Sequence, residues 1–139
     1  MSASPETGPR VLRPAGWPPP RGYADGVVAD GRIVALAGQV GWDPTTCEFA
    51  TDDFAEQTRQ ALRNVVALLA TAGATPAHLV RMTWFVTSRD AYAGARRALG
   101  AVWREEMGET YPPMSVVIVA GLWEPRALVE IEATAVVPR

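Results

Sequence analysis

The chain has 139 residues, of which 48% are hydrophobic and 20% are charged, and its formal net charge is −2. This length fits one domain, and this balance is typical of a globular protein rather than a disordered, collagen-like or coiled-coil chain. The acidic balance gives no basic surface for a nucleic-acid partner. No apolar stretch is long enough for a membrane span or a secretory signal, so we expect a cytoplasmic protein without a membrane partner.

Several reactive residue types are scarce or missing. The chain has one cysteine, Cys47, one histidine, His78, and no lysine, so its thirteen basic side chains are all arginines. One cysteine forms no intrachain disulfide, one histidine does not build a multi-histidine zinc site, and a lysine Schiff base is excluded. Chemistry is left to carboxylates, hydroxyls, arginine, one thiol, backbone groups and water, and we expect no metal or other cofactor.

The first 22 residues hold six of the twelve prolines. Proline fixes φ and lacks an N–H donor, so this segment is predicted to be an extended arm rather than a helix or a central strand. We therefore divide the chain into a proline-rich arm, residues 1–22, and a single domain, residues 23–139.

The first strands of the domain are predicted around a turn. Residues 27–29 and 32–37, which are apolar apart from Arg32, flank Asp30–Gly31, a pair typical of a two-residue hairpin. Gly38 and Gly41 follow closely. Two glycines within four residues indicate that the backbone bends there or that another group packs close to it.

The remaining elements alternate helix and strand. Residues 54–72 repeat apolar side chains at helical spacing behind an Asp53–Glu56 capping box, with polar residues such as Gln57 and Asn64 assigned to the solvent side. A strand is expected over 79–87, a second helix over 90–107, and strands over 114–122 and 128–137. The order ββαβαββ predicts an α+β fold, a mixed sheet with two helices on one face.

The last two strands are apolar on both faces. If two helices cover one face of the sheet, a monomer should present a polar second face to water. Apolar residues in both alternation phases therefore predict that a second copy covers the other face, in a homo-oligomer.

Two glutamates stand out in the last predicted strand. Glu130 and Glu132 are two residues apart, so they project from the same face among apolar neighbours. A carboxylate in apolar surroundings suits general acid or base catalysis, but it also suits a structural ion pair with an arginine across a subunit interface. For Glu132 the ion pair is favoured, and for Glu130 both interpretations stay open. Tyr23 is either a hydroxyl donor in a pocket or a packing residue, and neither Cys47 nor His78 is expected to be catalytic.

Taken together, these segments resemble the Rid/YjgF family of reactive intermediate deaminases, also called the endoribonuclease L-PSP family. The resemblance covers about residues 22–137 and is carried by Gly22–Tyr23 and the segments 36–39, 57–64, 80–86 and 128–136. It implies a chorismate-mutase-like fold, a homotrimer, and a small-molecule ligand bound in each cleft between subunits. It also implies hydrolysis of enamines or imines to a carbonyl compound and ammonia, without metal or cofactor.

The resemblance assigns site residues, and this sequence differs from the family pattern at one of them. It implies that Glu130 positions the attacking water and that Tyr23 lines the cleft. Met114, in Pro112–Pro113–Met114–Ser115, stands where active members carry an arginine that binds the substrate carboxylate in a bidentate manner. The chain thus resembles an Arg-lacking branch. A neutral, larger or aromatic ligand is expected, with Trp42 and Trp84 as wall residues, or else a substitute clamp formed by Arg126 or Arg81.

The sequence is consistent with two functions. The first is a deaminase-like hydrolase that acts on C=N bonds and uses Glu130. The second is a non-catalytic trimer that binds a small molecule, either to sequester it or to sense it. Retention of Glu130 favours the enzyme, and Met114 favours the binding protein. The older family name suggests nuclease activity, but the sequence indicates neither a basic groove nor a histidine pair that would support it.

Overall fold

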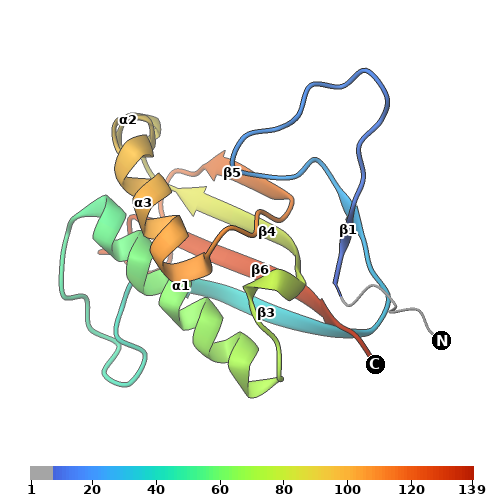
Figure 1. Ribbon diagram of the computed structural model, residues 1–139. Coiled ribbons are helices and arrows are strands. Elements are labelled where there is room, and N and C mark those ends of the chain that lie inside the picture. Colours follow the sequence, from blue (N-terminus) through green and yellow to red (C-terminus); the bar gives the residue numbers. More distant parts are fainter. Residues whose placement is uncertain (1–7) are drawn as a thin grey trace.

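The computed structural model describes residues 8–139 and is built on a four-stranded mixed sheet. The strands lie in the order β3 (Arg32–Val40), β6 (Val129–Val137), β4 (Leu79–Val86) and β5 (Met114–Ile118). β6 pairs antiparallel with both β3 and β4, whereas β4 and β5 run parallel. β3 and β5 are therefore the edges of the sheet (Figure 1).

The helices lie together on one face of this sheet (Figure 1). α1 (Phe54–Thr71) begins where the Asp53 carboxylate accepts a hydrogen bond from the Glu56 N–H, which is one half of the predicted capping box. The reciprocal half is not formed, because the Asp53 N–H donates to the Thr51 hydroxyl and the Glu56 carboxylate pairs with Arg59. A short 3₁₀ helix, η1 (Pro76–His78), leads into β4, and α2 (Arg89–Gly94) and α3 (Arg96–Met107) lead to β5. The α+β fold with helices on one face is thus confirmed.

Alternation along β6 separates the two faces of the sheet. Its odd-numbered residues are buried under the helices, where Val129, Ile131 and Ala135 are fully enclosed, and we call this side the helix face. Its even-numbered residues, Glu130, Glu132, Thr134 and Val136, project from the other side, which we call the open face. The core lies between the helix face and the apolar side of α1, where Leu62, Val65 and Leu69 are fully buried.

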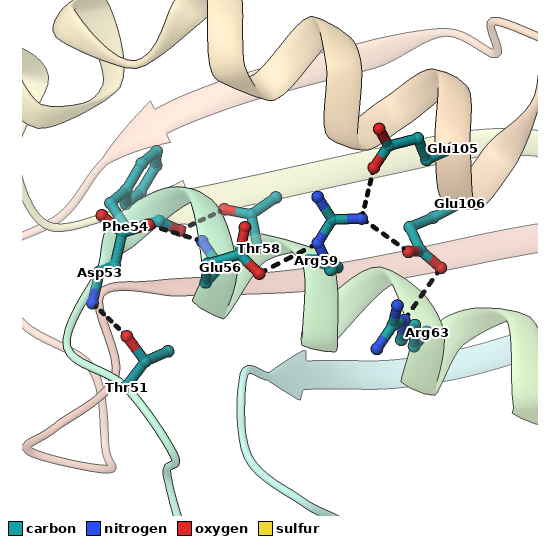
Figure 2. Close-up of polar contacts among 9 residues, drawn as sticks. All are labelled: Thr51, Asp53, Phe54, Glu56, Thr58, Arg59, Arg63, Glu105 and Glu106. Carbon is teal, nitrogen blue, oxygen red and sulfur yellow. Dashed lines mark hydrogen bonds and ion pairs between the residues drawn. The ribbon is translucent and has the colours of Figure 1, made fainter.

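Charged side chains join α1 to α3 at the surface (Figure 2). The Arg59 guanidinium donates to Glu56, to Glu105 at 2.6 Å and to Glu106 at 3.0 Å, and Arg63 lies 3.1 Å from Glu106. Hydrogen bonds with Glu105, Glu106 and Glu56 raise the pKa of Arg59 above its usual range. Partial burial alone would raise the pKa of Glu106, but the two arginines outweigh it and lower that pKa.

The N-terminal half differs from the sequence prediction in its strand pairing. β2 (Val27–Val28) pairs with β1 (Arg10–Val11) of the arm and not with β3, so the hairpin predicted around Asp30–Gly31 is absent. A type I′ turn needs positive φ at both central residues. Gly31 has a φ of 147°, and Cys47 is the only non-glycine residue of the described chain with a positive φ, so Asp30 does not adopt the required conformation.

Two later elements are shorter than predicted. The helix predicted over 90–107 is divided at Ala95, whose φ of −100° and ψ of 4° interrupt the helical path between α2 and α3. α3 ends at Gly108, with a φ of 80°, as its sequence predicts. The strand predicted to reach residue 122 ends at Ile118, the last residue that pairs with β4.

Candidate functional site

Glu130 lies on the open face between apolar neighbours. Its cross-strand partners are Val40 on β3 and Phe85 on β4, and its side chain is half-buried. Beside it the register of β3 shifts between Leu36 and Gln39. This bulge brings Gly38 against the Glu130 side chain, so closely that a β-carbon at Gly38 would collide with the carboxylate. The first of the two glycines thus marks a close approach, as the sequence predicts.

The polar side chains that anchor this region were assigned to solvent, and that prediction was wrong. Gln57 is completely buried; its amide donates to the carbonyls of Thr51 and Arg126, and its Oε1 accepts from the Leu128 N–H at 2.8 Å. Gln57 therefore fixes the loop that leads into β6, two residues before Glu130. The signal was present, since Gln57 is three residues after Phe54 on the apolar side of the helix.

Asn64 has the same role at the other side of Glu130. It is almost fully buried, and its Nδ2 donates to the carbonyls of Val40, at 3.1 Å, and Trp42, at 3.0 Å. Gly41 lies between these two carbonyls and packs against the backbone of Gln57, where a β-carbon would find no room. The end of β3 is therefore held against α1 by side-chain hydrogen bonds and a glycine contact.

Glu132 is more exposed than Glu130 and lies on the same face. It lines a shallow depression of about 160 Å³ together with Arg81, Thr83 and Thr134. Neither Glu130 nor Glu132 has a cation within ion-pair distance among residues 8–139. The ion pair favoured for Glu132 is therefore not formed within the described part of a single chain.

The loop after β3 holds Trp42 in place. Trp42 packs against Phe49 with ring centroids 5.9 Å apart. The backbone N–H and the hydroxyl of Thr45 both donate to the Asp43 carboxylate, and these hydrogen bonds lower the pKa of Asp43. Cys47 is exposed in this loop, with a φ of 60°. Trp42 follows Val40, the partner of Glu130, by two residues, so it lies at the same end of the sheet.

Arg126 is occupied by other partners. Its guanidinium lies 2.8 Å from the Asp52 carboxylate, contacts the Phe49 carbonyl at 3.3 Å and lies over the Phe49 ring. Because Asp52 balances its charge, Arg126 tethers the loop before β6 to the segment before α1. The hypothesis of a substitute clamp at Arg126 thus requires the ion pair with Asp52 to break.

Trp84 and Met114 do not lie with Glu130 in a single chain. Trp84 pairs with Ile131 and Met114 pairs with Met82, so both side chains lie on the helix face. Trp84 is 5% exposed and stacks on Trp103 with centroids 6.4 Å apart. The expectation that Trp84 forms a wall beside Glu130 is therefore not met within one chain, because the sheet separates the two.

Tyr23 is placed beside the start of β5. The next residue, Ala24, bridges to Pro113, and its N–H donates to the Pro112 carbonyl at 3.2 Å. Tyr23 itself is exposed. The structure therefore brings Tyr23 and Met114 to one edge of the sheet. In the described residues Tyr23 forms no hydrogen bond to Glu130.

Met114 also lines a hollow of about 350 Å³ at this edge, under α3. Tyr92, Trp103 and Tyr111 provide aromatic surface there, and Arg21, Arg96 and Arg104 provide positive charge. No acidic residue lines the hollow. No sequence pattern indicates this site, because its lining residues come from the arm, α2, α3 and the start of β5.

With the geometry established, comparison with known proteins gives the family. The family model described as endoribonuclease L-PSP matches residues 17–137. The chain belongs to this family, also called Rid/YjgF. A RutC family protein of Pyrococcus horikoshii, PH0854, is 32% identical over 118 residues, which are 85% of this chain and 90% of that protein. The resemblance stated from the sequence is thus confirmed.

Two further Rid/YjgF proteins connect the chain to an activity and to a solved structure. A 2-iminobutanoate/2-iminopropanoate deaminase of Salmonella typhimurium is 36% identical over 115 residues, 82% of this chain and 86% of that enzyme. The crystal structure of the Rid family protein YyfB from Yersinia pestis superposes with a TM-score of 0.82, at 32% identity over 94% of this chain and 99% of that one. Among residues 8–139, no helix is long and apolar enough to cross a bilayer.

Proposed function

We propose that this Rid/YjgF chain is a cytoplasmic, deaminase-like hydrolase that cleaves C=N bonds of reactive imines or enamines, with Glu130 positioning the water. The observation that carries the proposal is the setting of Glu130. Its carboxylate is half-buried between Val40 and Phe85, lies against Gly38, and has no cationic partner within residues 8–139. A carboxylate in this environment is suited to accept a proton from water.

The proposed reaction needs one group that moves protons. The Glu130 carboxylate accepts a proton as water adds its oxygen to the imine carbon, and the C=N double bond becomes a single bond. Glu130 returns that proton to the nitrogen, which gives a carbinolamine. Glu130 then accepts the proton of the carbinolamine hydroxyl and passes it to the nitrogen, the C–N bond breaks, and ammonia leaves as the carbonyl product forms. Water is the only co-reactant, and Glu130 ends in its initial state.

A complete cleft would require a second copy of the chain. Glu130 is on the open face, whereas Met114 and Tyr23 are at the β5 edge, so one chain alone does not surround a ligand with all three. Exposed apolar side chains support an interface, because Ile33 is 74% exposed and Val117 is 41% exposed. We propose a homotrimer in which each cleft joins the open face of one protomer to the β5 edge of the next. Light scattering at micromolar concentration tests this assembly.

Of the other predicted site residues, some contact the ligand in this proposal and some support the residues around it. Tyr23 and Met114 contact the ligand from the β5 edge, and Trp42 borders the cleft at the end of β3. Trp84 does not contact the ligand but supports the aromatic residues of the helix face. Its ring stacks on Trp103 and lies edge-on to Tyr92, and the Trp84 and Tyr92 centroids are 6.3 Å apart. Arg126 holds the loop before β6 through Asp52. The proposal includes membership of an Arg-lacking branch of the family, which Met114 supports.

A second function is favoured by Met114 alone. A thioether does not bind a carboxylate as a guanidinium does, so the residue that fixes an amino-acid-derived substrate is absent at this position. A trimer that binds a small molecule without converting it would need neither this arginine nor a free carboxylate. This alternative therefore predicts binding that is independent of Glu130.

Imine hydrolysis distinguishes the two functions. An amino-acid oxidase generates imino acids in place, and semicarbazide traps whatever the protein has not hydrolysed. We expect less trapped product with the wild-type chain, loss of that effect in Glu130→Gln, and retention in Glu132→Gln, which removes a neighbouring carboxylate from the same face. If aliphatic and aromatic imines both persist with the wild-type chain, the hydrolase proposal fails and the binding protein takes its place.

A further inference from the structure

The hollow under α3 has an organised positive rim. Arg96, Gly100 and Arg104 are spaced i, i+4 and i+8 along α3, so they lie on one side of the helix and all three line the hollow. Arg21 reaches the same hollow from the arm. Three arginines therefore line a space of about 350 Å³ that has no acidic lining residue.

The arginines of this rim are not neutralised within the described chain. None of the three forms an ion pair with a carboxylate of residues 8–139. The acidic residues of α3, Glu105 and Glu106, pair instead with Arg59 and Arg63 of α1, as Figure 2 shows. Gathered like charges are unfavourable, and an anion would relieve the repulsion.

Gly100 lies between Arg96 and Arg104 in the wall of the hollow. A β-carbon at Gly100 would lie 3.4 Å from Nη1 of Arg104, an ordinary contact distance, so the Arg104 guanidinium folds back over Gly100, in the direction of Arg96. Glycine in a helix interior is less stable than alanine by about 1 kcal/mol. Gly100 leaves the wall between the two arginines without a side chain.

The wall of the hollow is aromatic and fixed. The rings of Trp103 and Tyr111 stack 5.9 Å apart at an angle of 16°, and the indole N–H of Trp103 donates to the Thr110 carbonyl at 3.0 Å. Tyr92 and Met114 add further flat or polarisable surface. Such surfaces favour planar, apolar ligand groups.

We propose that this hollow binds an anion with an aromatic or similarly flat body, held through its negative group by Arg96 and Arg104, with Arg21 closing the rim. The flat body lies against Tyr92, Tyr111 and Met114, because Trp103 is 5% exposed and already stacks on Trp84 and Tyr111. These arginines supply the anion binding that Met114 lacks at its own position. The proposed ligand class is thus anionic and aromatic, whereas Met114 alone leads to the expectation of a neutral ligand.

This inference rests on the proposed function for the role of the ligand as a substrate, but not for its binding. The hollow is formed within one chain and contains no part of Glu130. Binding should therefore survive in Glu130→Gln even though hydrolysis is lost. If the chain binds 2-naphthoate but does not hydrolyse imines, only the proposed hydrolase function is contradicted. Hydrolysis of small aliphatic imines without naphthoate binding would overturn only this inference.

The experiment compares two probes of the same shape. Titration calorimetry of the full chain with 2-naphthoate and with its neutral isostere 2-naphthamide should give affinities at least about tenfold apart in favour of the anion. Affinity for 2-naphthoate should fall as salt is raised, because charge attraction at an exposed rim is screened. Equal affinities for the two probes, or no binding of 2-naphthoate at millimolar concentration, would overturn the proposal.

Matched variants locate the site. Arg96→Gln and Arg104→Gln should each weaken 2-naphthoate binding about five- to tenfold. Arg97→Gln, on the same helix but outside the hollow, should leave binding unchanged. Gly100→Leu fills the hollow while improving helix propensity, so it should abolish binding of both probes without lowering the melting temperature. An Arg97→Gln effect as large as the other two, or unchanged binding in Gly100→Leu, counts against the site.

Discussion

The Glu130 carboxylate occupies the space that a β-carbon at Gly38 would need, so these two residues of neighbouring strands are matched in size. Gly38→Ala should push the Glu130 side chain from its position between Val40 and Phe85. We expect a loss of imine hydrolysis of at least about tenfold and a loss of stability of about 1–3 kcal/mol from overpacking. The trapping assay and urea unfolding measure the two effects.

Gly121→Ala is the matched control for this substitution. No atom lies within 4 Å of the position that a β-carbon would take at Gly121. We expect its stability to stay within about 0.5 kcal/mol of the wild type, with unchanged hydrolysis. Equal behaviour of the two alanine variants would mean that Gly38 does not position Glu130.

Gln57→Leu tests the buried amide that holds the loop before β6. The variant leaves the Leu128 N–H without its acceptor and removes donors from the carbonyls of Thr51 and Arg126. We expect a stability loss of about 2–3 kcal/mol, because a buried group that loses its partner is not rehydrated. Gln60→Leu removes a single side-chain contact, with Asn64, and should cost less. Similar urea midpoints for the two variants would contradict the role of Gln57.

The elements that could be predicted from sequence are those that bury one face, because burial of that face produces a regular spacing of apolar residues. α1 and β6 follow their apolar periods of 3.6 and 2 residues, and their bounds differ from the prediction by only one residue. The predicted hairpin failed for a different reason. Turn type depends on φ at Asp30, and the partner of β2 is a segment of the arm, which the sequence predicts to be extended without indicating a partner for it.

The site could be predicted only in part, because it depends on register. Glu130 was identified from its apolar strand, and Gly38 from its spacing to Gly41. Whether Trp84 faces Glu130 or the helices depends on its pairing with Ile131, which no local pattern determines. Arg96 is exposed, and its helix face becomes the wall of a hollow only when β5 and the arm are placed beside it.

Glu106→Gln should reduce the acid sensitivity of the fold. Although burial opposes it, hydrogen bonds from Arg63 and Arg59 lower the pKa of Glu106 in the folded chain. A lowered folded pKa stabilises the protein above the unfolded glutamate value of about 4.3, and this contribution is lost as pH falls through the folded pKa. The variant should melt at a lower temperature than the wild type at pH 7, and the difference should shrink below about pH 4.

Glu109→Gln provides the reference for this pH series. Glu109 is exposed and takes part in none of the ion pairs of residues 8–139. Its melting temperature should follow that of the wild type across the series. A constant difference between Glu106→Gln and the wild type from pH 7 to pH 3 would show that the ion pairs with Arg59 and Arg63 do not contribute through the charge of Glu106.

Met114→Arg tests whether one position sets the size of the ligand. The side chain of Met114 lies at the wall of the hollow and packs against the core, next to the stacked rings of Trp103 and Tyr111. A guanidinium there would add a carboxylate-binding group close to the β5 edge while occupying the surface proposed for a flat ligand body. We therefore expect faster hydrolysis of small aliphatic imino acids and weaker binding of 2-naphthoate in the same variant. Met114→Leu keeps the apolar volume and should change neither. The trapping assay with oxidase-generated imines measures the hydrolysis rate, and the calorimetric titration measures the affinity for 2-naphthoate. If Met114→Arg changes both quantities in the same direction, or changes neither, Met114 is not part of the binding site.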